Sequence, residues 1–147
     1  MATILLPTDF KEFLRLLTSC EVEYLLIGGY AVNYHGYPRA TGDMDIWIAN
    51  TPANAARAAA AVRQFGFARA AENDFAQPDK VIRMGLPPLR IEVLTSVSGL
   101  EFASAFARRL RAEVDGVPVN LIGLEDLKAN KKACGRLKDL VDLEQLS

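Results

Sequence analysis

Two aspartates, Asp43 and Asp45, stand two residues apart at the start of an apolar segment. Alternate residues of a strand point to the same face of a sheet, so this spacing predicts two adjacent carboxylates. Such a pair repels itself unless a cation lies between the two groups, and carboxylate oxygens suit Mg²⁺. Arg39 and Thr41 just precede the pair and are candidates for orienting a phosphate or bracing the loop. Taken alone, Asp-x-Asp is more often a loop cap or a solvated turn.

Two further features favour phosphate chemistry. Gly28-Gly29 ends an apolar run and opens a short helical segment, where a phosphate can approach free backbone N–H groups. Glu92 is the single acid of the apolar segment 89–94, and a buried carboxylate needs a metal, a partner or solvent beside it. Each feature also has an ordinary alternative. A Gly-Gly pair often only ends a strand at a turn, and Glu92 could face water at a sheet edge.

Hydrophobic spacing predicts the elements that would position these residues. Asp115-Gly116 predicts a tight hairpin turn. Helices are expected over 8–19, 30–35, 52–65, 100–108, 125–133 and 137–146, and strands over 22–27, 44–49, 67–70, 81–84, 89–94, 110–114 and 117–121. Residues 73–80 read as a polar loop. The pattern indicates an α/β (α+β) fold in which helices flank a mixed sheet. We expect a single domain over 1–147, with a core over 1–123 and C-terminal helices over 124–147.

The composition of the 147 residues excludes several classes of protein. Half of the residues are hydrophobic and 24% are charged, which is typical of a globular protein and not of a disordered one. A net charge of -1 argues against attachment to nucleic acid or membrane mainly by bulk charge. The apolar runs are far shorter than the ~20 residues that span a bilayer, and the N-terminus has no secretion signal pattern. Cys20 and Cys134 lack zinc-ligand spacing. We therefore expect a reduced, cytoplasmic protein that does not contact membranes.

The order Gly28-Gly29, Asp43-x-Asp45 and a third acid, Glu92, on a later strand resembles the nucleotidyltransferase (polymerase-β-like) superfamily. Within it, the segment 28–45, GGYAVNYHGYPRATGDMD, is most similar to the AbiEii-like branch. That branch includes toxins of bacterial toxin–antitoxin pairs and many small uncharacterised proteins. The resemblance implies a mixed sheet flanked by helices, with a helical pair at the C-terminus.

A second stretch, 130–143 (NKKACGRLKDLVDL), is similar to the closing pattern of the same branch, a lysine followed by Arg-x-x-Asp-apolar-x-Asp. This resemblance implies functional roles for Lys131 and Asp139. The residues alone leave two interpretations of the basic cluster around Lys131: a solvated helix face, or a clamp for a triphosphate or an RNA acceptor. The cluster consists of Lys128, Lys131, Lys132, Arg136 and Lys138. Asp139 and Asp142 could also pair with that cluster.

The resemblance implies transfer of a nucleoside monophosphate from an NTP, with release of pyrophosphate. Two Mg²⁺ ions would be held by Asp43, Asp45 and Glu92, and Glu92 could also accept the proton of the attacking hydroxyl. Backbone N–H groups of Gly28-Gly29 would hold the β- and γ-phosphates, with Lys131 as a mobile positive charge on the same oxygens. Arg39 and Thr41 are secondary candidates for nucleotide contact, and Asp139 would act beside Lys131.

Three functions remain open at this point. The first is a Mg²⁺-dependent, NTP-consuming (ATP or another nucleotide) enzyme that modifies an RNA or protein acceptor, as the toxin partner of an antitoxin protein. The second is a transferase for small molecules of the antibiotic type. The third is a nucleotide-binding or partner-binding module that no longer catalyses, although the three intact acids weigh against it. The sequence indicates neither the nucleotide nor an oligomeric state.

Overall fold

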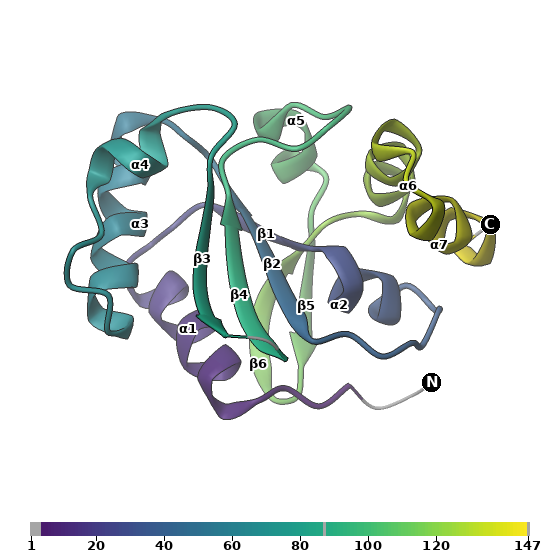
Figure 1. Cartoon of the computed structure of the whole chain (residues 1–147), viewed down its shortest axis with the longest axis horizontal. Coiled ribbons are helices and arrows are strands. Elements are labelled where there is room, and N and C mark those ends of the chain that lie inside the picture. The colour runs from purple at the N-terminus through teal and green to yellow at the C-terminus, as the bar shows by residue number, and fades with distance from the viewer. Residues whose placement is uncertain (1–3, 87, 147) are drawn as a thin grey trace.

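A computed structural model of the chain describes residues 4–86 and 88–146. Residues 1–3, on which part of the expectation about the N-terminus rests, lie outside the described residues. The centre of the molecule is a six-stranded mixed sheet in the order β3-β4-β2-β1-β6-β5 (Figure 1). The strands are β1 (Tyr24–Ile27), β2 (Asp43–Ile48), β3 (Val81–Leu86), β4 (Leu89–Leu94), β5 (Leu110–Val114) and β6 (Val117–Leu121).

The central strand β2 connects the sequence motifs in space. It pairs antiparallel with β1 and parallel with β4. In this register Asp45 lies between Ile27 of β1 and Glu92 of β4. The sheet is extended by the antiparallel pairs β3–β4 and β5–β6, and β6 runs parallel to β1. The pairing therefore places the Asp-x-Asp strand, the glycine-ended strand and the Glu92 strand side by side.

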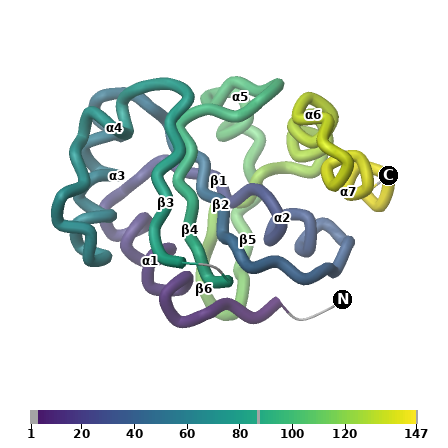
Figure 2. Tube along the Cα trace, in the orientation of Figure 1, coloured from purple at the N-terminus to yellow at the C-terminus, as the bar shows by residue number. Residues whose placement is uncertain are grey.

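Helices cover both faces of the sheet. In Figure 1, α1, α3 and α4 lie to the left of the sheet, and α2, α6 and α7 lie to its right. The trace in Figure 2 follows the chain from α2 into β2 and shows the C-terminal pair α6–α7 on the same side as α2, where α2 and α6 are in contact. The helices are α1 (Thr8–Ser19), α2 (Gly28–Tyr34), α3 (Pro52–Phe65), α4 (Glu72–Ala76), α5 (Phe102–Ala107), α6 (Leu124–Cys134) and α7 (Leu137–Leu146).

Burial along β2 alternates at the end that carries the acids. Met44, Ile46 and Ile48 are fully buried on one face. Asp43, Asp45 and Trp47 share the other face because side chains alternate along a strand. Trp47 is buried and packs edge-on against Phe102 of α5, with ring centroids 5.0 Å apart. That face is therefore closed at Trp47, whereas Asp43 and Asp45 are only half-buried.

The structure confirms the fold class and most predicted elements. β4, β5 and β6 have the predicted bounds, and Asp115 and Gly116 form the hairpin turn with φ of 48° and 79°. Gly135, with φ of 67°, separates α6 from α7. No helix within residues 4–86 and 88–146 is both long and apolar enough to cross a membrane.

Two predictions about the middle of the chain are wrong. Residues 67–70 form turns instead of a strand, and part of the expected polar loop 73–80 is the helix α4. The physical reason is Phe75, which is buried while Phe67 is exposed. The segment around Phe75 forms a helix that packs against α3. Burial of this one apolar side chain therefore outweighs the polar composition of the segment.

Candidate active site

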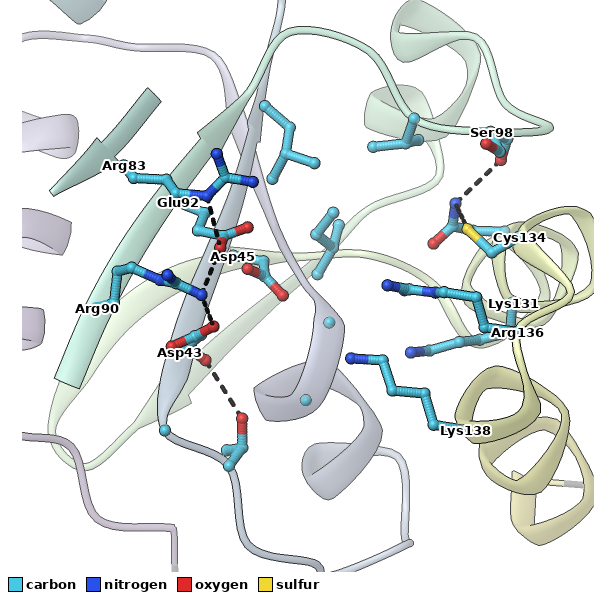
Figure 3. A pocket seen from close by; sticks show the side chains of 18 of the residues that line it. Asp43, Asp45, Arg83, Arg90, Glu92, Ser98, Lys131, Cys134, Arg136 and Lys138 are labelled. Carbon is cyan, nitrogen blue, oxygen red and sulfur yellow. Dashed lines mark hydrogen bonds and ion pairs between the residues drawn. The ribbon is translucent and has the colours of Figure 1, made fainter. Parts of the chain in front are cut away.

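A cavity of about 800 Å³ opens where β1, β2 and β4 face α2, α6 and α7. Acidic side chains from the sheet form one wall, and basic side chains from the C-terminal helices form the other (Figure 3). The cavity is lined by all but one of the residues predicted to form the site: Gly28, Gly29, Arg39, Thr41, Asp43, Asp45, Glu92 and Lys131. Asp139 is the exception, because it is fully buried behind Lys131.

The acidic wall consists of Asp43, Asp45 and Glu92. Asp45 and Glu92 are register partners on parallel strands, and Asp43 is the register partner of Arg90. Nη2 of Arg90 donates to Asp43 Oδ2 at 3.0 Å and also lies 3.1 Å from Glu92 Oε1. Arg83 adds a second contact to Glu92, at 3.3 Å from Nε to Oε1. A guanidinium therefore already neutralises two of the three acids.

Asp45 is the acid without an ion-pair partner in the described part of the chain. Burial, followed by repulsion from Glu92 and Asp43, raises its pKa from 3.8 to about 6. Lys131 and Lys138 act in the opposite direction, because their positive charges favour the carboxylate. Because ionisation of Asp45 is unfavourable here, a cation bound next to its carboxylate would be stabilising.

The donor set fits a divalent metal by its chemistry. Three carboxylates from two adjacent strands line the same cavity, and hard oxygen ligands of this kind suit Mg²⁺. Within residues 4–86 and 88–146, no three His, Cys, Asp or Glu side chains form a ready-made metal-binding group. Arg90 holds Asp43 and Glu92 instead. Binding of a metal would therefore have to displace or share the Arg90 contacts.

Gly28 is required by the position of Asp45. A Cβ atom at Gly28 would overlap Oδ2 of Asp45, and Gly28 has a φ of 68°, which L side chains rarely adopt. Gly29 is crowded in the same way by the hydroxyl of Thr41. Both glycines form the first turn of α2, which begins two residues earlier than predicted. Their N–H groups belong to the helix end that lacks intrahelical partners.

Arg39 and Thr41 lie on the segment that joins α2 to β2. The Thr41 hydroxyl donates to the Asp43 carbonyl oxygen at 3.3 Å, which braces the start of β2. The Arg39 guanidinium makes two hydrogen bonds of 2.8 Å to Asp142 of α7. Arg39 therefore ties this segment to the C-terminal helices.

The basic wall is built on two buried aspartates. Nζ of Lys131 lies 3.1 Å from Asp139 and 3.1 Å from Asp142, and all three side chains are buried. Arg136 donates to Asp139 at 2.6 and 3.3 Å. Burial alone would raise the pKa of both aspartates, but hydrogen bonds from Arg136 or Arg39, and from Lys131, outweigh burial and lower it. Lys131 thus reaches the cavity wall while held by two carboxylates.

Two charged residues of the cavity, Arg83 and Arg90, were missed by sequence reasoning. Arg90 had an available signal, because it stands two residues before Glu92 on the same strand face. Arg83 had none, since its place depends on the pairing of β3 with β4. Lys138 belongs to the basic cluster that the sequence predicts around Lys131, and the structure places it at the cavity.

Comparison with known families agrees with this geometry. Residues 7–147 match the family described as "Nucleotidyl transferase of unknown function" (DUF2204). The chain belongs to this family. The match confirms the predicted superfamily and an enzyme of the nucleotidyltransferase class, for which an NTP is the implied co-substrate. No curated protein sequence matches the chain.

A solved structure has the same fold as this family member. It is the lincosamide antibiotic adenylyltransferase LnuA with lincomycin bound, at 12% identity and a TM-score of 0.58. The alignment covers 98% of both chains, so the likeness includes the C-terminal helices as well as the sheet. At this identity the likeness establishes the fold.

Proposed function

We propose that this nucleotidyltransferase moves a nucleoside monophosphate from an NTP to an acceptor hydroxyl in a Mg²⁺-dependent reaction. The observation that carries the proposal is that Asp43, Asp45 and Glu92 line one wall of a cavity and face a basic wall. An acidic wall suits a metal ion, and a basic wall suits the phosphates of the nucleotide.

Two Mg²⁺ ions would be held by the carboxylates of Asp43, Asp45 and Glu92. When bound, the metal lowers the pKa of the attacking hydroxyl and neutralises charge on the triphosphate. Its binding would also relieve the repulsion that raises the pKa of Asp45. The three acids therefore serve binding and chemistry together.

The remaining residues of the cavity bind and orient the nucleotide. The N–H groups of Gly28 and Gly29 face phosphate oxygens, and Thr41 and Arg39 keep the adjoining segment in place. The acceptor oxygen attacks the α-phosphorus, and the bond from this phosphorus to its bridging oxygen breaks. Pyrophosphate leaves with the electron pair of that bond, and Glu92 accepts the proton of the hydroxyl. Positioning of the acceptor oxygen and the α-phosphate supplies most of the rate enhancement.

An RNA or protein acceptor is the first candidate. It rests on the resemblance of segments 28–45 and 130–143 to the AbiEii-like branch, which includes toxins of toxin–antitoxin pairs. Under this proposal the chain is such a toxin, and an antitoxin protein is its partner. The basic side chains of α6 and α7 at the cavity would face the acceptor or the triphosphate.

A small-molecule acceptor is the second candidate, and a specific observation favours it. The alignment with LnuA, whose bound ligand is lincomycin, extends over 98% of that chain as well as of this one. An adenylyltransferase for an antibiotic therefore has a fold that aligns with nearly all of this chain. The fold of this chain is therefore compatible with a small-molecule acceptor.

Label transfer distinguishes the two candidates. Each α-labelled NTP is incubated with Mg²⁺ and total bacterial RNA, total protein or a small-molecule extract containing lincosamides. Asp45→Asn serves as the blank. Label in RNA or protein supports the first candidate, and label in the small-molecule fraction supports the second. Equal labelling by wild type and Asp45→Asn would contradict the proposed site.

A further inference from the structure

Lys138 lies on the basic wall of the cavity together with Lys131 and Arg136. It lies in the first turn of α7 and lines the cavity. Figure 3 shows it extending from α7 toward the acidic wall, next to the start of α2. Within residues 4–86 and 88–146 it makes no ion pair, and its side chain is exposed. Its ammonium group is therefore available to a ligand.

Lys131, Arg136 and Arg39 are already committed to carboxylates. Lys131 is shared between Asp139 and Asp142, each 3.1 Å away, and is buried. Arg136 and Arg39 each hold one of the same two aspartates. If Lys131 moved to a phosphate, it would leave two buried carboxylates with fewer partners, which is costly. Lys131 is thus suited to hold α6 and α7 together and not to follow a ligand.

We propose that Lys138 is the cation that contacts the terminal phosphates of the NTP, while Lys131 is a positioning residue that keeps α7 and Lys138 in place. The proposal rests on the nucleotidyl transfer proposed above and assigns the triphosphate end of that site. An ammonium on a flexible four-carbon stem can follow phosphate oxygens as they are released with pyrophosphate. The contact is lost when the product leaves.

The electrostatics of the cavity support this assignment. Lys138 and Asp45 line the same cavity, Lys138 from α7 and Asp45 from β2 (Figure 3). Lys138 and the acidic wall therefore face each other across the space in which a metal-bound triphosphate would lie. A triphosphate carries enough negative charge to satisfy both a metal at the acids and an ammonium opposite.

Equilibrium binding of NTP and of the matching NMP, with Mg²⁺ present, tests the proposal. Lys138→Ala is expected to raise the Kd for NTP about tenfold and to change the Kd for NMP less than about twofold. Lys138→Arg is expected to restore most of the affinity, because it keeps the charge. Lys132→Ala is the matched control, since Lys132 is exposed on α6 and does not line the cavity.

Lys131→Met separates positioning from contact. It is expected to lower the unfolding temperature, because two buried aspartates lose a partner, whereas Lys138→Ala leaves that temperature unchanged. Unchanged NTP affinity in Lys138→Ala, with wild type binding NTP, would overturn the role of Lys138 and leave the proposed function standing. Failure of the wild-type protein to bind any NTP would overturn the proposed function itself and the role of Lys138 with it.

Discussion

Gly28 and Asp45 fit together only because Gly28 has no side chain. A Cβ atom there would overlap the Asp45 carboxylate, because Gly28 directly follows β1 and Asp45 lies on β2, which pairs with β1. The glycine pair and the aspartate pair, which are separate motifs in the sequence, therefore contact each other in the fold. The glycine serves the position of the carboxylate as well as access to backbone N–H groups.

Gly28→Ala is therefore expected to abolish NTP-dependent metal binding at the acidic wall. Both strain at positive φ and displacement of Asp45 contribute, with a loss of about 1–2 kcal/mol in the free energy of unfolding from strain alone. Gly116→Ala is the matched control, because Gly116 has a φ of 79° but nothing near its Cβ position. Urea unfolding and Mn²⁺ titration measure the two effects. Equal metal binding by Gly28→Ala and Gly116→Ala would contradict the role of the contact.

Asp45→Asn is expected to stabilise the metal-free protein at high pH. Because the folded state holds the Asp45 proton more tightly, with a pKa of about 6 against 3.8, stability falls as pH rises through this interval. The neutral amide avoids that loss, so the free energy of unfolding should rise by about 1–3 kcal/mol at pH 8 and hardly change at pH 4. Urea unfolding with EDTA at both pH values measures this. A gain of the same size at pH 4 and pH 8 would exclude Asp45 ionisation as its cause.

Arg90→Gln is expected to tighten binding of a divalent ion in the absence of nucleotide. Arg90 neutralises Asp43 and Glu92 from a single nitrogen, so its removal leaves more negative charge for the metal. The Kd for Mn²⁺ should fall about threefold to tenfold. Arg111→Gln, on the edge strand β5 and away from the cavity, is the control. Weaker Mn²⁺ binding in Arg90→Gln would show that Arg90 organises the acids and does not compete with the ion.

The two cysteines provide an internal test of where the nucleotide binds. Cys134 lines the cavity, whereas Cys20 lies at the end of α1 beside Gln64, and both are half-buried free thiols. NTP with Mg²⁺ is expected to slow maleimide modification of Cys134 in proportion to the fraction of protein bound. Modification of Cys20 should continue at the same rate. Peptide mass spectrometry resolves the two sites, and equal rates for Cys134 with and without NTP would place the nucleotide elsewhere.

The sequence predicted the parts of the site that depend on local pattern. The bounds of β4, which carries Glu92, follow from its apolar run, and β2 begins and ends one residue earlier than the predicted strand 44–49. The hairpin at Asp115 follows from turn chemistry, which is also a signal within a few residues. The contact between Arg90 and Glu92 is also local, because the two residues stand two positions apart on one face of β4.

Other features of the site could not be predicted because they depend on distant contacts. The Arg39–Asp142 ion pair joins residues separated by 103 positions, and no local pattern encodes such a partner. The resemblance suggested Lys131 as a mobile cation, whereas the fold brings Asp139 and Asp142 to either side of it. Helix α4 was missed because burial of Phe75 outweighed local composition.

Metal binding at the acidic wall in the presence of nucleotide tests the central claim most directly. Mn²⁺ is titrated into the protein with each of four NTP analogues in which methylene replaces the α–β bridging oxygen, and bound Mn²⁺ is followed by electron paramagnetic resonance. Wild type should bind Mn²⁺ at least about tenfold more tightly than Asp43→Asn, Asp45→Asn or Glu92→Gln, since each variant loses a charged ligand. Glu113→Gln on β5, outside the cavity, should match wild type. Wild-type affinity in all three acid variants would contradict the assignment of Asp43, Asp45 and Glu92 as the metal site.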